Sequence, residues 1–132
     1  MKLTNRSEYA LLALIYLARS KTELVPGTEI SKAQEIPMRF MQQILLTLKQ
    51  ARIVKSVKGH AGGYALAKNP KKLSLAEIVR LFEGPLASSR SVSQYFYEHT
   101  PIEREKKVIK LLKELRDIVS ERLENTYLSD ML

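Results

Sequence analysis

The stretch "IPMRFMQQILLTLKQARIVKSVKGHAGGYALAK", residues 36–68, changes its hydrophobic period part-way along. Its first half predicts a helix that begins near Pro37, because apolar side chains recur at helical spacing: Met41, Ile44, Leu45 and Leu48. In its second half, "IVKSVK" and "YALA" alternate apolar with polar residues on either side of the glycine-rich "GHAGG". Alternation around residues that tolerate positive φ predicts a β-hairpin. Residues 36–68 therefore predict a helix followed by two short antiparallel strands.

A shorter helix is predicted immediately before this stretch. "TEISKAQE", residues 28–35, has helical character with Thr28 as its N-cap, and Ile36-Pro37 breaks the chain before the longer helix. Upstream, residues 5–20 are apolar on most sides, which indicates a central helix packed against several neighbours. Helix, tight turn, longer helix and hairpin follow one another in the order of a winged helix-turn-helix, which we expect over residues 1–85.

A further helix and a loop are predicted next. "SLAEIVRLFEG", residues 74–84, begins with Ser74 and Glu77, which form a capping-box pair, and ends at Gly84 before a proline. The serine-rich residues 86–100 predict an exposed loop, which is also the expected place of a sensing segment.

A long helix is predicted within residues 101–132. Thr100-Pro101-Ile102-Glu103 combines an N-cap, a proline at the first helical position and a capping box, and the helix should run to about Glu124, roughly 24 residues on. Its apolar stripe is too wide to be covered by a small domain alone: Val108, Leu112, Leu115, Val119 and Leu123, with Leu111 and Ile118 beside them. We expect a partner helix of a homodimer to cover this stripe, the alternative being an ordinary core helix. The expected fold is thus mainly α with a small β-hairpin: a winged helix-turn-helix domain plus a long C-terminal dimerisation helix.

The charge of the chain is concentrated in one region. The formal net charge is +8, and residues 36–76 hold eight basic and no acidic residues. Such a patch favours a polyanionic partner, either nucleic acid or an anionic membrane surface. The nine apolar residues from Ala10 to Ala18 are far fewer than the roughly 20 needed to span a bilayer, and Glu8 interrupts any leader. We therefore expect a cytoplasmic protein with no membrane partner.

Several kinds of chemistry are excluded by residue type and spacing. The chain has no cysteine, which excludes disulfides, thiolate metal sites and cysteine nucleophiles. The glycines of "GHAGG" do not have the spacing of a phosphate-binding loop, and no Lys-Ser or Lys-Thr pair follows them. His60 and His99 both lie in predicted loops with no nucleophile or orienting acid nearby in sequence. We expect no enzymatic activity, no metal site and no cofactor.

DNA binding fits the remaining features. In a winged helix-turn-helix the N-terminal part of the second helix enters the major groove, where Arg39, Gln42 and Gln43 would lie. Arginine can bind guanine O6 and N7 with two hydrogen bonds, and glutamine can bind adenine N6 and N7 in the same way. Phosphate contacts are expected from the basic residues of and after the hairpin: Lys55, Lys58, Lys68, Lys71 and Lys72. At the hairpin tip, His60 either touches the minor groove or is solvated.

The chain resembles the Rrf2 family of bacterial transcription regulators. The likeness lies in "MKLTNRSEYALLALIYLA" at the start, in residues 36–68, in "AEIVRLFEGPL", and in "TYLSDML" near the end. It implies a dimer with crossed C-terminal helices that reads a palindromic operator as a repressor. Matching positions imply base and backbone contacts from the second helix, through Arg39, Phe40, Gln42 and Gln43. They also make Lys58, just before Gly59, the counterpart of a basic wing residue that reaches the minor groove.

The chain departs from this family in the second helix, where Arg39 is more basic than the residue of some relatives, and in the sensing segment. Gln42 stands where several relatives have a glutamate that tunes sequence preference, so a different operator is implied. Cluster-binding members also carry three cysteines between the helix ending near Gly84 and the long helix, and this chain has none. A cysteine-ligated iron–sulfur cluster is therefore not expected. His99 is not a metal site by itself, because the matching position of the long helix is Ile109.

The sequence thus predicts a sequence-specific regulator that binds double-stranded DNA and responds to a small-molecule or protein effector. An alternative is a protein-interaction module that docks a metabolic enzyme through residues 86–100. The aromatic run Tyr95, Phe96 and Tyr97 would serve such docking or a small-molecule pocket, or would pin the loop to the dimer. RNA binding is a third alternative, although the chain lacks the stacking aromatics expected on an exposed sheet.

Overall fold

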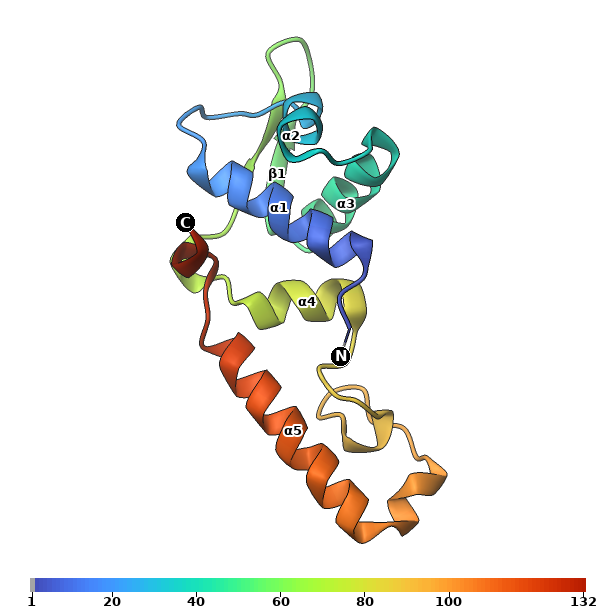
Figure 1. Ribbon diagram of the computed structural model, residues 1–132. Coiled ribbons are helices and arrows are strands. Elements are labelled where there is room, and N and C mark those ends of the chain that lie inside the picture. Colours follow the sequence, from blue (N-terminus) through green and yellow to red (C-terminus); the bar gives the residue numbers. More distant parts are fainter. Residues whose placement is uncertain (1) are drawn as a thin grey trace.

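A computed structural model describes residues 2–132 and shows a winged helix-turn-helix body from which one long helix projects (Figure 1). The helices and strands are α1 (Asn5–Arg19), α2 (Gly27–Gln34), α3 (Met38–Gln50), β1 (Val54–Val57), β2 (Gly63–Leu66), α4 (Leu75–Glu83) and α5 (Lys106–Glu124). Short 3-10 turns lie at Pro70–Lys72, Arg90–Val92, Pro101–Arg104 and Leu128–Met131. The predicted fold class, mainly α with one small hairpin, is confirmed. None of the helices within residues 2–132 has both the length and the hydropathy of a membrane span.

The predicted apolar face of α3 forms part of the core. Met41, Ile44, Leu45 and Leu48 are all buried, in one cluster with Leu14 of α1 and with Ile30 of α2. Ala10 and Ala13 on α1 are also fully buried, and their small side chains let neighbouring elements approach closely. Because one face of α3 is held in this way, its remaining face is directed outward.

The turn between α2 and α3 is made by backbone geometry. Glu35 adopts the left-handed conformation with φ 55°, and the Ile36 N–H donates to the Ser31 carbonyl at 2.9 Å. At its other end, α2 begins at Gly27, with Pro26 in the N-cap position and its carbonyl accepting from the Glu29 and Ile30 amides. The prediction that Thr28 is the N-cap was therefore wrong by two residues. Thr28 lies inside the first turn because the Pro26 carbonyl already accepts the first helical hydrogen bonds.

The hairpin is attached to the segment that leads into α2. β1 and β2 pair antiparallel, with Val54 opposite Leu66 and Val57 opposite Gly63. Tyr64 in addition bridges to Val25: its N–H donates to the Val25 carbonyl at 2.8 Å, and the Val25 N–H donates to the Tyr64 carbonyl at 2.9 Å. The predicted hairpin is confirmed, and this extra bridge sets its position beside the helices.

The capping box predicted for α4 is only half formed. The Glu77 N–H donates to the Ser74 hydroxyl at 3.2 Å, as predicted, and Gly84, with φ 77°, is the C-cap that follows Glu83. The Glu77 carboxylate, however, pairs with Lys68 rather than with the backbone of Ser74. An ammonium group offers a carboxylate a charge-assisted hydrogen bond, which is stronger than one from a neutral amide.

The long helix begins later than predicted. Pro101–Arg104 forms a separate 3-10 turn, Glu105 is non-helical with φ −92° and ψ 84°, and α5 spans 19 residues from Lys106. Thr100 makes no side-chain cap, so the predicted capping box was wrong. Its second member, Glu103, accepts a hydrogen bond from the Tyr97 hydroxyl at 2.8 Å and lies 2.7 Å from His99 Nδ1. The carboxylate needed for the box is therefore occupied by the preceding loop.

The chain returns to the winged body after α5. The Leu75 N–H donates to the Thr126 carbonyl and the Leu128 N–H donates to the Leu73 carbonyl, both at 2.8 Å. Leu128 is fully buried in the same cluster as the helices of the winged domain. Figure 1 shows this C-terminal turn lying beside α1 and the start of α4. The base of α5 is thus joined to the winged body by both backbone hydrogen bonds and core packing.

Candidate nucleic-acid interface

The outward face of α3 carries two rows of side chains. Met38, Gln42 and Leu46 are spaced four residues apart, and with Lys49 they line a groove that faces the hairpin. Arg39 and Gln43, also four residues apart, form the neighbouring row outside this groove. Arg39, Gln42 and Gln43 are all exposed, as predicted. The predicted base-contacting residues therefore all lie on the outward side of α3. Gln42 lines the groove, whereas Arg39 and Gln43 lie outside it.

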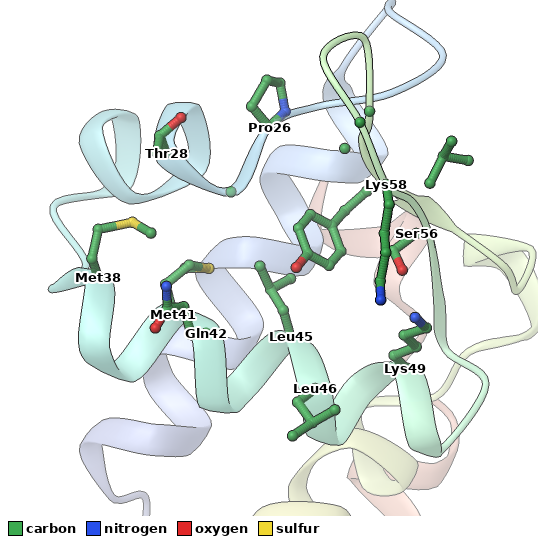
Figure 2. Close-up of a pocket in the computed structure, with 16 residues that line it drawn as sticks. Pro26, Thr28, Met38, Met41, Gln42, Leu45, Leu46, Lys49, Ser56 and Lys58 are labelled. Atoms are coloured by element: carbon green, nitrogen blue, oxygen red, sulfur yellow. The ribbon is translucent and has the colours of Figure 1, made fainter.

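The groove between α3 and the hairpin has a volume of about 600 Å³. Ser56, Val57, Lys58 and Gly59 form its hairpin side, and Tyr64, Met41 and Leu45 lie deeper in it. Figure 2 shows the side chains of Lys49 and Lys58 extending toward each other, one from each side of the groove. The groove therefore combines partly apolar walls with two cationic groups, a surface that suits the sugar–phosphate chain of a nucleic acid.

The hairpin presents the predicted wing residues to solvent. Lys55, Lys58, Gly59 and His60 are all exposed, and Gly59 has φ 112°, a conformation that side-chain-bearing residues rarely adopt. Within residues 2–132, neither Lys55 nor Lys58 has an acidic partner within salt-bridge distance. Lys68 differs, because it pairs with Glu77 and its charge is compensated.

Phe40 supports the interface from behind. Its ring packs against Tyr9 of α1 with a centroid distance of 5.7 Å, and the Arg39 guanidinium lies over the Phe40 ring, 4.8 Å from its centroid. Phe40 is half-buried against the core. A cation over an aromatic face is restrained in direction, so Phe40 helps to orient Arg39. The DNA contact predicted for Phe40 itself stays a prediction.

Three exposed apolar residues on this surface were not among the predicted site residues. Leu46 is 56% exposed, Val57 54% and Met38 38%, and all three line the groove. The sequence did contain a signal for Met38 and Leu46. The buried stripe of α3 is complete without these two residues, so they have no place in the core.

Only part of the predicted dimerisation stripe is exposed, because the rest packs against the same chain. Leu123 packs against Ala76, Val79 and Leu86 of its own chain, and Leu112 and Val119 are half-buried. The exposed apolar residues of α5 are Val108, Leu111, Leu115 and Ile118, and Ile118 is 65% exposed. The open stripe is therefore rotated from the predicted one toward Leu111 and Ile118.

Residues 86–100 are more closely packed than the predicted exposed loop. Ser91, Val92 and Ser93 are buried, and Arg116 of α5 donates from Nη1 to the Val92 carbonyl at 2.9 Å. The Arg80 guanidinium lies 4.9 Å from the ring centroid of Tyr95. The prediction of an exposed loop was wrong for these three residues, because their backbone lies against α5.

The end of this segment forms a small polar cluster. Hydrogen bonding from the Tyr97 hydroxyl, followed by that from His99, lowers the pKa of the Glu103 carboxyl. The same hydrogen bond raises the pKa of Tyr97, because ionisation would remove the proton that the hydroxyl donates to Glu103. The cluster joins the loop to the turn that precedes α5. That the aromatic run pins the loop to a dimer stays a prediction.

The Rrf2 family model, described as an iron-dependent transcriptional regulator, matches residues 3–132. The chain belongs to the Rrf2 family. It is 30% identical over 132 residues to the HTH-type transcriptional regulator CymR of Bacillus subtilis, covering 99% of this chain and 89% of CymR. It is 37% identical over 100 residues to an rrf2-like HTH-type regulator of Rhodobacter capsulatus, covering 73% of this chain and 67% of that protein. With three further curated relatives the match spans only 51–58% of their length.

The fold of this Rrf2-family chain is also similar to that of a solved relative. The structure of CymR, the global cysteine regulator of B. subtilis, superposes with a TM-score of 0.78 at 27% identity, covering 99% of this chain and 95% of that one. These relatives are transcription regulators and not enzymes, so the prediction of a non-enzymatic, DNA-binding regulator is confirmed at the level of the family.

The iron dependence in the family description does not fit the donor groups of this chain. It has no cysteine, and residues 2–132 contain no group of three histidine, aspartate or glutamate side chains that could hold a metal ion. His99 lies in the expected region but is paired with Glu103 alone. Thiolates are the ligands that iron–sulfur clusters use, and one imidazole with one carboxylate does not replace them.

Proposed function

We propose that this Rrf2-family protein is a homodimeric repressor that binds a palindromic operator in double-stranded DNA without a cysteine-ligated cluster. The observation that carries the proposal is the outward face of α3 and the hairpin, which is basic and free of carboxylates from residue 36 to residue 76. Phosphate repulsion is thereby avoided over the whole predicted contact surface. Action on chromosomal DNA would place the protein in the cytoplasm.

The geometry supports distinct roles for helix and hairpin. With α3 in the major groove, Arg39, Gln42 and Gln43 would meet base edges, because the N-terminal turns of a recognition helix are the ones that reach them. Lys55 and Lys58 on the hairpin would neutralise phosphates, which adds affinity without sequence information. Gly59 and His60 would lie at the hairpin tip, nearest to the adjacent minor groove.

The open stripe of α5 supports a homodimer. Val108, Leu111, Leu115 and Ile118 recur at spacings of three and four residues along the projecting helix, so a second copy of the same helix could cover them. A two-fold dimer has two recognition helices related by that symmetry, which matches an operator of two inverted half-sites about one helical turn apart. A dimer seated on a promoter would repress transcription by excluding RNA polymerase.

A salt titration tests the DNA-binding proposal. Binding of a duplex selected from a random pool should weaken with salt, with a log–log slope of about 0.9 per phosphate contact. Gln43→Ala should cost about 1–3 kcal/mol and relax preference at one operator position, whereas Lys58→Ala should weaken binding to all duplexes alike. Absent or salt-independent binding would refute the proposal, and stronger competition by RNA duplexes would redirect it to RNA.

Repression has its own test. Transcription in vitro from a promoter that contains the selected duplex should fall as protein is added, and it should not fall with a promoter in which both half-sites are scrambled. An increase in transcript would instead make the protein an activator.

The protein-docking alternative is favoured by one observation. Tyr95, Phe96 and Tyr97 remain exposed on the segment 86–100, although its backbone is anchored to α5. The same segment could take a small-molecule or protein effector in a regulator. Replacing Tyr95 and Phe96 by alanine should leave operator affinity in the absence of effector unchanged; a metabolic enzyme that binds the wild type but not this variant would support docking.

A further inference from the structure

The row of side chains that faces the groove has an unusual composition for a DNA-contacting surface. Gln42 stands between two exposed apolar residues, Met38 one helical turn before it and Leu46 one turn after it. Figure 2 shows Met38, Gln42 and Leu46 along α3, and Met41 and Leu45, which also line the groove, are buried. The neighbouring row, Arg39 and Gln43, has no such apolar flanks.

Core packing does not account for these two apolar side chains. Leu46 is 56% exposed and Met38 is 38% exposed, whereas Leu45 beside them is 1% exposed and fills the core. Single exposed apolar residues are common on protein surfaces. Two of them on either side of the same polar side chain, in a region otherwise rich in lysine, suit a partner with apolar groups next to polar ones.

Base edges in the major groove supply that combination at A·T pairs. Adenine presents N7 and N6 to the two hydrogen-bonding groups of a glutamine side chain, and the paired thymine presents its C5-methyl group, the apolar contact group of the major groove. A G·C pair lacks this methyl group, because cytosine carries only a hydrogen on C5. A glutamine flanked by apolar side chains therefore complements A·T pairs in both respects.

The spacing along the helix also agrees. Four residues of α-helix rise about 6 Å, and base pairs are stacked about 3.4 Å apart, so Met38 and Leu46 would reach methyl groups one or two base steps from the pair that Gln42 contacts. Lys49 continues the row, and Lys58 faces it across the groove. The phosphates on either side of the base pair that Gln42 contacts would therefore meet cationic groups. Charge complementarity thus commits the groove to a DNA strand.

We propose that Met38, Gln42 and Leu46 form a reader of A·T base pairs, in which Gln42 binds adenine and the two flanking apolar side chains bind thymine methyl groups. This inference rests on the proposed DNA-binding function and adds a sequence preference to it. Each operator half-site then contains at least one thymine whose methyl group, and not only its hydrogen-bonding pattern, is recognised.

Replacing thymine by uracil tests this directly, because uracil keeps every hydrogen-bonding group and lacks only the methyl. The probe is the duplex selected from a random pool by the wild-type protein, with each thymine replaced in turn by deoxyuridine in both half-sites. Burial of one methyl contributes about fourfold in affinity, so loss of the same methyl from both half-sites should weaken binding about 16-fold at the sensitive positions. Replacement of thymines outside the contacted base pairs should leave the affinity unchanged.

Protein variants assign the effect to residues. Leu46→Ala and Met38→Ala should bind the thymine duplex more weakly and should each lose the difference between thymine and uracil at one position. Gln50→Ala, exposed at the C-terminal end of α3 and outside the groove, is the matched control and should keep the full difference. Circular dichroism on each variant checks that the fold is retained.

The outcomes separate the inference from the function on which it rests. If the wild type binds the selected duplex but discriminates no thymine from uracil, the A·T reader is refuted and DNA binding stands. A difference retained by both Met38→Ala and Leu46→Ala also refutes the assignment to this row. Failure to select any duplex from the pool would instead overturn the proposed function.

Discussion

Gly63→Ala should detach the hairpin from the helices and thereby weaken DNA binding. A Cβ atom at Gly63 would lie 2.7 Å from both the carbonyl carbon and the carbonyl oxygen of Val25, and 3.0 Å from the Pro26 nitrogen. These are backbone atoms, so no side-chain rotamer can relieve the contact. The two hydrogen bonds between Val25 and Tyr64, at 2.8 and 2.9 Å, would have to break or lengthen.

The expected destabilisation follows from these contacts. Each hydrogen bond contributes about 1 kcal/mol net, and forced overpacking costs about 1–3 kcal/mol, but opening of the hairpin relieves part of the overpacking. The free energy of unfolding should therefore fall by about 2–4 kcal/mol. Because Lys58 and Gly59 move with the hairpin, operator affinity should fall as well.

Urea unfolding followed by circular dichroism at one fixed protein concentration gives the first quantity, and fluorescence anisotropy with labelled operator gives the second. His60→Ala at the exposed hairpin tip is the control for stability, and its effect on unfolding should stay within about 0.5 kcal/mol. The reasoning is refuted if Gly63→Ala matches the wild type in both stability and operator affinity.

Leu128→Ala should lower the free energy of unfolding by about 2–5 kcal/mol in urea titrations, because Leu128 is fully buried in the core of the winged domain. Ile118→Glu should convert the dimer to monomers in light scattering and weaken operator binding, since two half-sites then bind independently. Tyr97→Phe should raise the pKa of Glu103 in an NMR titration, because Tyr97 is the main group that lowers it. The stabilisation from that contact is present above the ordinary carboxyl pKa and is lost as the pH falls through the lowered pKa of the folded state.

Each of these three predictions has a result that would contradict it. An unchanged unfolding curve for Leu128→Ala would mean that the C-terminal turn is not part of the core. Lys110→Glu, an exposed change on the same helix, is the control for Ile118→Glu; loss of the dimer in both variants would indicate a charge effect rather than a packed stripe. A Glu103 pKa that does not respond to Tyr97→Phe would contradict the hydrogen bond between them.

Local features of this protein were predictable from its sequence. The spacing of Met41, Ile44, Leu45 and Leu48 specified both the helix and its buried face, because helical periodicity depends only on residues a few positions apart. The alternation around "GHAGG" specified the hairpin for the same reason. The outward direction of Arg39, Gln42 and Gln43 followed from the buried face.

Only the tertiary structure decided which partner each side chain takes. Glu77 and Glu103 both occupy capping-box positions in the sequence, yet Glu77 pairs with Lys68, and Glu103 with Tyr97 and His99. Leu123 belongs by spacing to the stripe of α5, yet its own chain covers it. A side chain binds the strongest partner within reach, and that competition depends on segments brought together by folding, which no local pattern contains.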